Sequence, residues 1–250
     1  MPAAHIEYLL RLADNPLILG QRLSEWCGHA PVLEEDLALA NMALDLIGQA
    51  RLLLAHAGAR EGGGRDEDQL AFLRSEREFR NCTLVELPNG DFGRTVLRNF
   101  LFGAYQLPLW DALQASTDAQ LAAIAAKSIK EARYHLRHAA DWVERLGGGT
   151  EESHGRMRAA VDDLWPYTAE LFATDALEEA AAASGIGVIG GSLQAPWEAT
   201  VLPVLEQAAL HPPARTPFLS QGKLGLHSEH MGHLLAEMQY MQRAYPGAQW

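Results

Sequence analysis

The sequence has few of the residues that mark secreted or membrane-bound proteins. Its only cysteines are Cys27 and Cys82, too few for a disulfide framework or a Cys-rich zinc site. Apolar runs are short and interrupted by polar residues, so we expect no membrane-spanning segment. The first residues show no basic region followed by an apolar one, so we expect no secretory signal. These features predict a cytoplasmic protein that does not bind a membrane.

Several classes of chemistry are also excluded by what is missing. The net charge is −12, whereas a nucleic-acid surface needs clustered Lys and Arg, so we expect no nucleic-acid partner. There is no Gly-x-Ser-x-Gly nucleophile motif. There is also no Gly-x-Gly-x-x-Gly or Walker loop, so no dinucleotide or phosphate site is indicated.

Helix signals dominate the chain, and strand signals are nearly absent. Apolar residues recur every three or four positions between Gly- and Pro-containing turns. We expect the second, fourth, fifth and last helices to form a four-helix core with shorter helices around it. With no internal repeat or long linker, the sequence predicts one all-α domain, 1–250. The helices are expected at about 16–28, 32–57, 66–81, 92–115, 117–146, 155–172, 174–183, 193–210 and 224–244, with a connection at 211–222.

A polar stripe crosses the second expected helix. Asn41, Asp45 and Gln49 lie four residues apart and so share one face of a helix that is otherwise apolar nearly all round, which predicts burial. Asp45 could then be a metal-bridging carboxylate. Alternatively, the stripe is a hydrogen-bonded seam with Arg or His of a neighbouring helix. We favour the seam, because Asn and Gln are poor ligands for iron.

Two Glu–His pairs have almost the spacing of a di-iron bundle. Such bundles use Glu-x-x-His, three residues apart, on each of two helices. Here Glu131 and His135 lie four apart, and so do Glu229 and His233. The positions three after the glutamates hold Tyr134 and Gly232.

The spacing therefore argues against a di-iron site in this chain, and we expect no metal, cofactor or catalytic site of its own from the rest of the sequence either. Carboxylate and imidazole are nevertheless suitable iron ligands. A vestigial or alternative metal site would draw on Asp45, Glu131, His135, Glu229, His230 and His233. The histidines of the last helix, His227, His230 and His233, could equally form a polar seam or an interface.

Distinctive sequence blocks occur from one end of the chain to the other. They include Arg22-Leu-Ser-Glu-Trp-Cys-Gly-His-Ala-Pro31, Lys130-Glu-Ala-Arg-Tyr-His-Leu-Arg137, Gly225-Leu-His-Ser-Glu-His230 and Pro246-Gly-Ala-Gln-Trp250. Shorter blocks are Asp36–Asn41, Leu46–Arg51, Val85–Gly90 and Leu235–Tyr240. As a set they resemble the C subunits of the phenylacetyl-CoA epoxidase (ring 1,2-phenylacetyl-CoA mono-oxygenase) family.

The resemblance implies a ferritin-like fold and membership of a multicomponent mono-oxygenase of aerobic phenylacetate degradation. In that family, the catalytic A subunit carries the di-iron site and binds the CoA ester. The C subunit is its metal-free structural partner, and a reductase subunit supplies electrons through NADPH, flavin and an iron–sulfur cluster. The resemblance thus implies a hetero-oligomer with the A subunit and the other subunits, and a possible homodimer when the chain is alone.

Three hypotheses follow. The chain is a non-catalytic structural subunit that scaffolds the A subunit. It is itself a catalytic di-iron oxygenase subunit that uses Asp45, Glu131, His135, Glu229 and His230. Or it is a stand-alone helical binding module. The out-of-register pairs and the resemblance favour the first.

Overall fold

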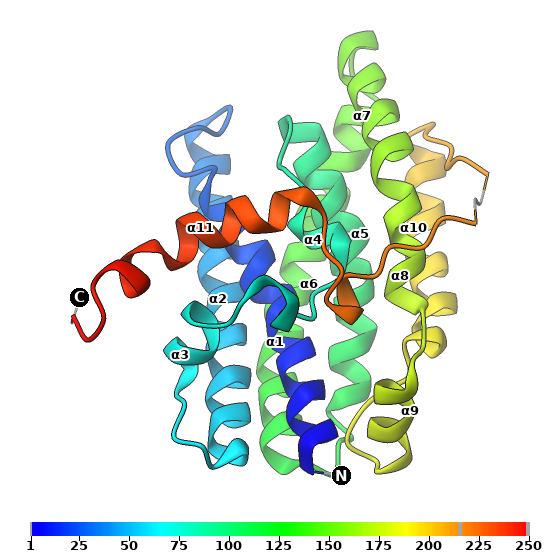
Figure 1. The fold of residues 1–250 in the computed structure, drawn as a ribbon. Coiled ribbons are helices and arrows are strands. Elements are labelled where there is room, and N and C mark those ends of the chain that lie inside the picture. Colours follow the sequence, from blue (N-terminus) through cyan, green and yellow to red (C-terminus); the bar gives the residue numbers. More distant parts are fainter. Residues whose placement is uncertain (1, 215–216, 249–250) are drawn as a thin grey trace. The chain divides into compact units, whose positions relative to one another are not determined.

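The computed structural model describes residues 2–214 and 217–248 (Figure 1). Within these residues, the regular secondary structure consists of helices, with no β-strand. One isolated bridge, Gln221 to Leu226, is the only β-type pairing in that part of the chain. The predicted fold class, an all-α ferritin-like protein with long helices and shorter flanking ones, is confirmed. The chain folds as two compact units. Unit 1 comprises Met1–Pro88 and Ser220–Trp250, and unit 2 comprises Asn89–Leu219.

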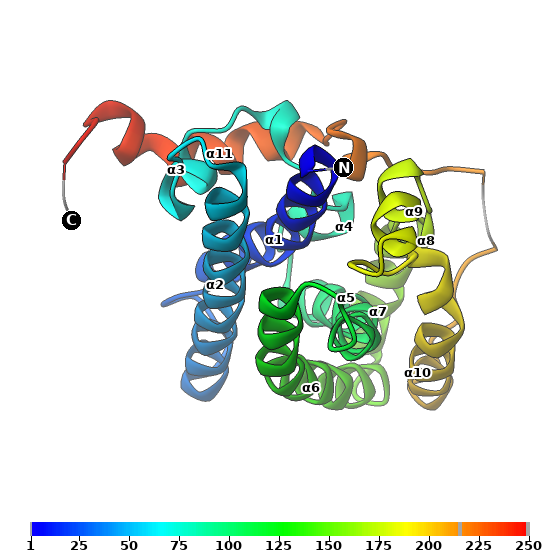
Figure 2. The ribbon, with the colours of Figure 1, turned by 90° about the horizontal axis from the view of Figure 1, so that it is seen from below.

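Unit 1 is built on two long antiparallel helices. Helix α1 (Pro2–Ser24) packs along α2 (Leu33–Glu61) (Figures 1 and 2). Buried apolar residues recur every three or four positions along α2. Short elements cover this pair. They are α3 (Glu67–Phe72), η1 (Glu76–Glu78), α4 (Thr83–Glu86), η4 (Gly222–Leu224) and α11 (Glu229–Ala244). In Figure 1, α11 runs crosswise to α1 and α2, and it contacts α3, α4 and η1.

The first helix begins much earlier than the sequence indicated. A helix was expected at 16–28, but Pro16 lies inside α1, which ends at Ser24 rather than at Gly28. The Asn15 side chain joins α1 to a later segment: its Oδ1 accepts from the Cys82 amide at 2.8 Å, and its Nδ2 donates to the Arg11 carbonyl. Packing of α1 on α2 therefore outweighs the cost of an internal proline.

The third expected helix, 66–81, is also wrong. A helix does start close to the expected position, with Asp66 as its cap and a capping box to Gln69, but α3 ends at Phe72. A short 3-10 turn follows, and residues 79–82 are extended. Arg74 takes part in a buried ion pair in this segment, which is a tertiary contact that local periodicity does not reveal.

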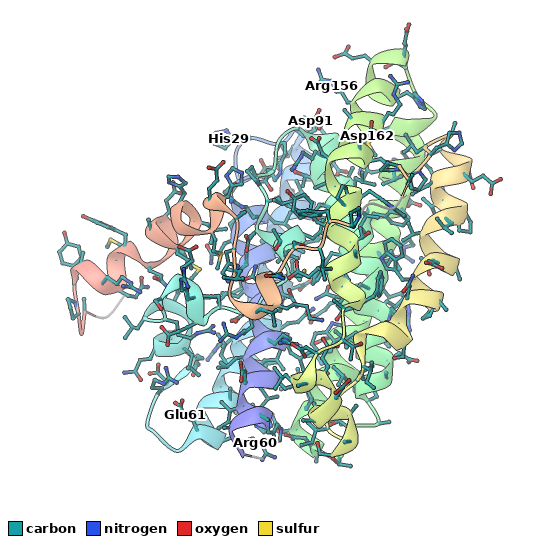
Figure 3. The ribbon with its side chains drawn as sticks, turned by 45° about the vertical axis from the view of Figure 1, so that its right-hand side comes forward. His29, Arg60, Glu61, Asp91, Arg156 and Asp162 are labelled. Carbon is teal, nitrogen blue, oxygen red and sulfur yellow. The ribbon has the colours of Figure 1, made fainter. Side chains whose placement is uncertain are left out.

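Unit 2 is built on a second long pair. Helix α5 (Phe92–Leu113) packs along α6 (Ala119–Gly147), close to the expected 92–115 and 117–146. The remaining elements are α7 (Glu151–Leu164), η2 (Trp165–Thr168), α8 (Ala169–Phe172), α9 (Ala176–Ala183), η3 (Gly190–Leu193) and α10 (Gln194–Gln207). Figure 3 labels Arg156 and Asp162 on α7; Arg156 lies 3.6 Å from Asp91, the N-cap of α5.

Among the described residues the four longest helices are α1 and α2 in unit 1 and α5 and α6 in unit 2, so the expected set of four long helices needs one correction. The last helix was expected among the four, but α11 has 16 residues whereas α1 has 23. Residues 215–216 of the expected connection, and Gln249 and Trp250 of the last sequence block, lie outside the described residues. The single-domain assignment stays a prediction.

In the part of the chain that the structure describes, one helix is long and apolar enough to span a membrane by length and composition alone. An 18-residue window of α2 has a mean hydropathy of 1.4, and 44% of it is buried within the protein. The expectation that no apolar segment is long enough was therefore wrong for α2. A core helix passes the same test, and Leu39, Leu46 and Leu53 of α2 are buried.

Candidate functional site

The six possible metal ligands are distributed over both units. Asp45 on α2 and Glu229, His230 and His233 on α11 belong to unit 1. Glu131 and His135 on α6 belong to unit 2. Within either unit, the described residues bring none of the six into a group of three metal-binding side chains with ligand atoms within 4.8 Å of one another.

The polar stripe of α2 is only partly buried. Asn41 is exposed, Asp45 is half-buried and Gln49 is buried. The expectation of a helix buried all round was wrong, because one face of α2 is open along its first half. Asp45 does have an interaction within the protein, so the seam hypothesis for the stripe stays open.

On α6, the two candidate ligands have different surroundings. The Glu131 carboxylate lies 3.8 Å from the Lys127 ammonium, one turn earlier, in a partly exposed ion pair. His135 is buried, with its ring against Tyr134 on the same helix. A lysine beside a carboxylate offers a positive charge where a di-iron site needs the metal.

On α11, the candidate ligands lie mainly toward solvent. Glu229 and His233 are exposed and His230 is half-buried. A di-iron bundle needs inward-facing carboxylates from several helices. The described residues of α6 and α11 therefore do not fit such a site, and the assignment of no metal site to this chain stays a prediction.

Buried charged side chains are found in unit 1, where α1 contacts the segment between α3 and α4. Arg74 and Asp14 form a bidentate ion pair with side chains 2% and 0% exposed. The Arg80 amide donates to Asp14 at 2.8 Å, and the Arg74 guanidinium lies 4.2 Å from the Phe79 ring centroid. Each charge is thus both paired and hydrogen-bonded, as burial requires.

A second buried pair lies nearby in the same unit. His227 Nδ1 is 2.7 Å from Glu86 Oε2, and both side chains are fully buried. Glu86 also accepts from the Ser228 amide at 2.6 Å and from Asn81 Nδ2 at 2.8 Å. Arg22 donates twice to the Glu86 carbonyl. These bonds tie α1, α4 and the start of α11 together.

Unit 1 carries an exposed apolar strip, defined by Val32, Leu33, Leu37 and Leu44. Leu33 is 72% exposed and Leu44 67% exposed. The three leucines are four and seven residues apart, which places them on one face of α2. Leucines aligned in this way on an exposed helix are typical of a protein contact surface.

Comparison with known proteins identifies the family. The family model described as phenylacetic acid catabolic protein matches residues 1–250. The chain belongs to this family. The C subunit of the 1,2-phenylacetyl-CoA epoxidase of Escherichia coli (strain K12) is 53% identical to it over 243 residues, covering 97% of this chain and 98% of that protein. The resemblance drawn from the sequence blocks is confirmed.

The two buried pairs of this chain were not found from its sequence. The Gly225–His230 block was recognised by resemblance, but its histidines were considered only as metal ligands or a polar seam. Glu86 and His227 are 141 residues apart, so no helical spacing connects them. One signal could have pointed to Glu86. It is a charged residue between the apolar residues Leu84-Val85 and Leu87-Pro88, and a buried carboxylate in such a segment needs a partner.

Proposed function

We propose that this chain is a non-catalytic structural subunit of a phenylacetyl-CoA 1,2-epoxidase. It scaffolds a homologous catalytic A subunit that carries the di-iron site. Sequence similarity over nearly the whole chain to a protein named as the C subunit of that epoxidase supports membership of the complex. The reductase subunit would supply NADPH, flavin and iron–sulfur chemistry, and this chain none of it.

The exposed apolar strip on α2 is the observation that carries the scaffolding role. Its leucine side chains are exposed to water. Full burial of each one against a partner would stabilise association by about 1.5–3 kcal/mol. The strip belongs to a helix whose opposite face is anchored on α1, so the partner meets a surface of fixed shape. A rigid, apolar surface suits a permanent subunit contact.

Introducing charge into the strip should therefore prevent assembly. In the Leu33→Asp/Leu37→Asp/Leu44→Asp variant, three carboxylates would be buried without partners at the contact, and the dissociation constant should rise by more than about 100-fold. Copurification with the A subunit and sedimentation of the mixture measure this. Leu202→Asp, at an exposed leucine of α10, is the matched control and should assemble normally.

The experiment also distinguishes the stand-alone alternatives. Far-UV circular dichroism of the triple variant should be unchanged, because the replaced side chains are exposed. Full assembly of a folded triple variant would show that the strip is not the contact. If even the unaltered chain fails to bind the A subunit and runs as a monomer or homodimer, the scaffolding role itself is wrong.

The rival hypothesis, a catalytic di-iron subunit, makes a different prediction for α6. If the chain is structural, the Glu131→Ala variant should assemble and support unchanged epoxidation, because Glu131 pairs with Lys127 rather than with a metal. Iron analysis of the separated chain should find far fewer than the about two irons that a di-iron bundle holds. Lost turnover in an assembled complex, together with tightly bound iron, would establish the catalytic hypothesis instead.

A further inference from the structure

The buried His227 ring is surrounded on both of its nitrogens by hydrogen-bond acceptors. Nδ1 faces Glu86 Oε2 at 2.7 Å, and Nε2 faces the Phe79 carbonyl oxygen at 3.1 Å. A neutral imidazole has one N–H and one lone pair. Either neutral tautomer therefore leaves a lone pair directed at one of these oxygens, and only the imidazolium ion donates to both.

The acceptor beside Nδ1 is held in place by two further donors. Glu86 accepts hydrogen bonds from the Ser228 amide and from Asn81 Nδ2 as well as facing the ring. The protonated ring is therefore the form that donates to both of the oxygens it faces. Losing the ring proton would break one of the two hydrogen bonds and leave a buried carboxylate with a weaker partner.

Other charged groups around the ring come from several elements. Glu76 of η1 adds negative charge, Arg22 of α1 holds the Glu86 carbonyl, and Arg80 donates to the same Phe79 carbonyl as the ring. On its own segment, His227 precedes Glu229 and His230. Burial lowers the pKa of His227, but the hydrogen bond and charge of Glu86, with smaller contributions from Phe79 and Glu76, outweigh it and leave the pKa above its ordinary value of 6.5.

The His227 ring lies at the end of a segment, residues 221–228, that packs against residues 77–86. Ser228, the N-cap residue of α11, is held by Glu86 through its amide. Just before it, Gly222 approaches the Asn81 carbonyl so closely that a Cβ would lie 2.5 Å from that oxygen. Gly225 has a φ of +80° and lies against the Arg77 carbonyl. Residues 221–228 are thus packed closely against residues 77–86, with the Glu86–His227 pair at the end of the contact.

We propose that Glu86 and His227 form a pH-sensitive latch, which fastens the start of α11 to α4 while the ring is protonated and loosens as the ring loses its proton. The stabilisation has a definite sign. Because the folded-state pKa is raised, the stabilisation is complete below pH 6.5 and is lost as the pH rises through the higher folded-state value. Local opening of residues 221–232, rather than global unfolding, is the expected response, because the other contacts of unit 1 do not involve this ring.

Hydrogen–deuterium exchange of the whole protein tests the latch. After correction for the intrinsic pH dependence of exchange, peptides spanning 221–232 should exchange about tenfold faster at about pH 9 than at about pH 6. His227→Gln, which cannot carry a charge, should remove this difference and exchange fast at both pH values. His233→Gln, at an exposed histidine of α11, should behave as the unaltered protein.

Two results would overturn the latch. One is equal corrected exchange at both pH values in the unaltered protein. The other is a folded His227→Gln variant that retains the full pH dependence. If that variant does not fold, ¹⁵N spectroscopy of the histidine rings in the unaltered protein decides: two protonated nitrogens on His227 below its pKa support the latch, and a single one contradicts it.

Discussion

The Asp14→Ala variant should lose about 3–5 kcal/mol of unfolding free energy, a large part of what holds a domain of this size together. The substitution leaves the Arg74 guanidinium buried, with its side chain 2% exposed and no counter-charge from Asp14. It also removes the acceptor of the Arg80 amide. Urea denaturation followed by circular dichroism measures the loss, with a fall in the midpoint at unchanged slope.

A paired substitution separates the cost of an orphaned charge from the value of the ion pair. Asp14→Leu/Arg74→Met removes both charges and fills the space with apolar atoms, so it should recover about half of the loss seen in Asp14→Ala. Recovery is incomplete because Arg74 also donates to the Leu70 and Glu78 carbonyls. An exposed pair is the control: Glu152→Ala, which breaks a contact to Arg156, should change stability by less than about 0.5 kcal/mol. If Asp14→Ala is as mild as Glu152→Ala, the buried pair does not hold unit 1 together.

The second large effect is expected in unit 2, at Trp197. Its ring is 2% exposed and packs against Trp165 and Phe172, with centroid separations of 5.4 and 5.2 Å. Its Nε1 donates to the Leu101 carbonyl at 2.8 Å and so ties α10 to α5. Trp197→Ala removes the ring and leaves a cavity, which should cost about 3–5 kcal/mol.

Trp197→Phe is the matched variant, because it retains an aromatic ring and loses the N–H donor. Trp197→Phe should lower the free energy of unfolding less than Trp197→Ala does, because the phenyl ring fills part of the cavity that alanine leaves empty. Thermal and urea denaturation of both variants give the comparison. Equal losses would assign most of the stabilisation to the hydrogen bond, and no loss in either would show that α10 is held to α5 by other contacts.

Local sequence signals were sufficient where a helix is long and bounded by its own turns. Helices α5 and α6 begin and end within about two residues of the expected positions, because Asp91 caps the start of α5 and the Gly147–Gly149 run ends α6 whatever surrounds them. Local signals failed at Pro16 and over residues 73–82. There, contacts with residues far along the chain override proline chemistry and helical spacing.

The exposed strip on α2 shows a similar limit. Periodicity indicated a helix that is apolar nearly all round, but the pattern does not say which apolar face is covered. The structure leaves Leu33 and Leu44 open, while Leu39 and Leu46 on the other face are buried. Composition alone therefore assigned Asn41 and Asp45 to the interior, where only Gln49 is buried.

The sequence by itself determined the helical class, the family and the four-residue spacing of Glu131 with His135 and of Glu229 with His233, because these depend on local order and on matched blocks. Only the tertiary structure decided the partners of the buried charges. Asp14 and Arg74 are 60 residues apart, and Glu86 and His227 are 141 apart. Such pairs form because a buried charge must find a counter-charge wherever the fold brings one close, and no local pattern records that partner.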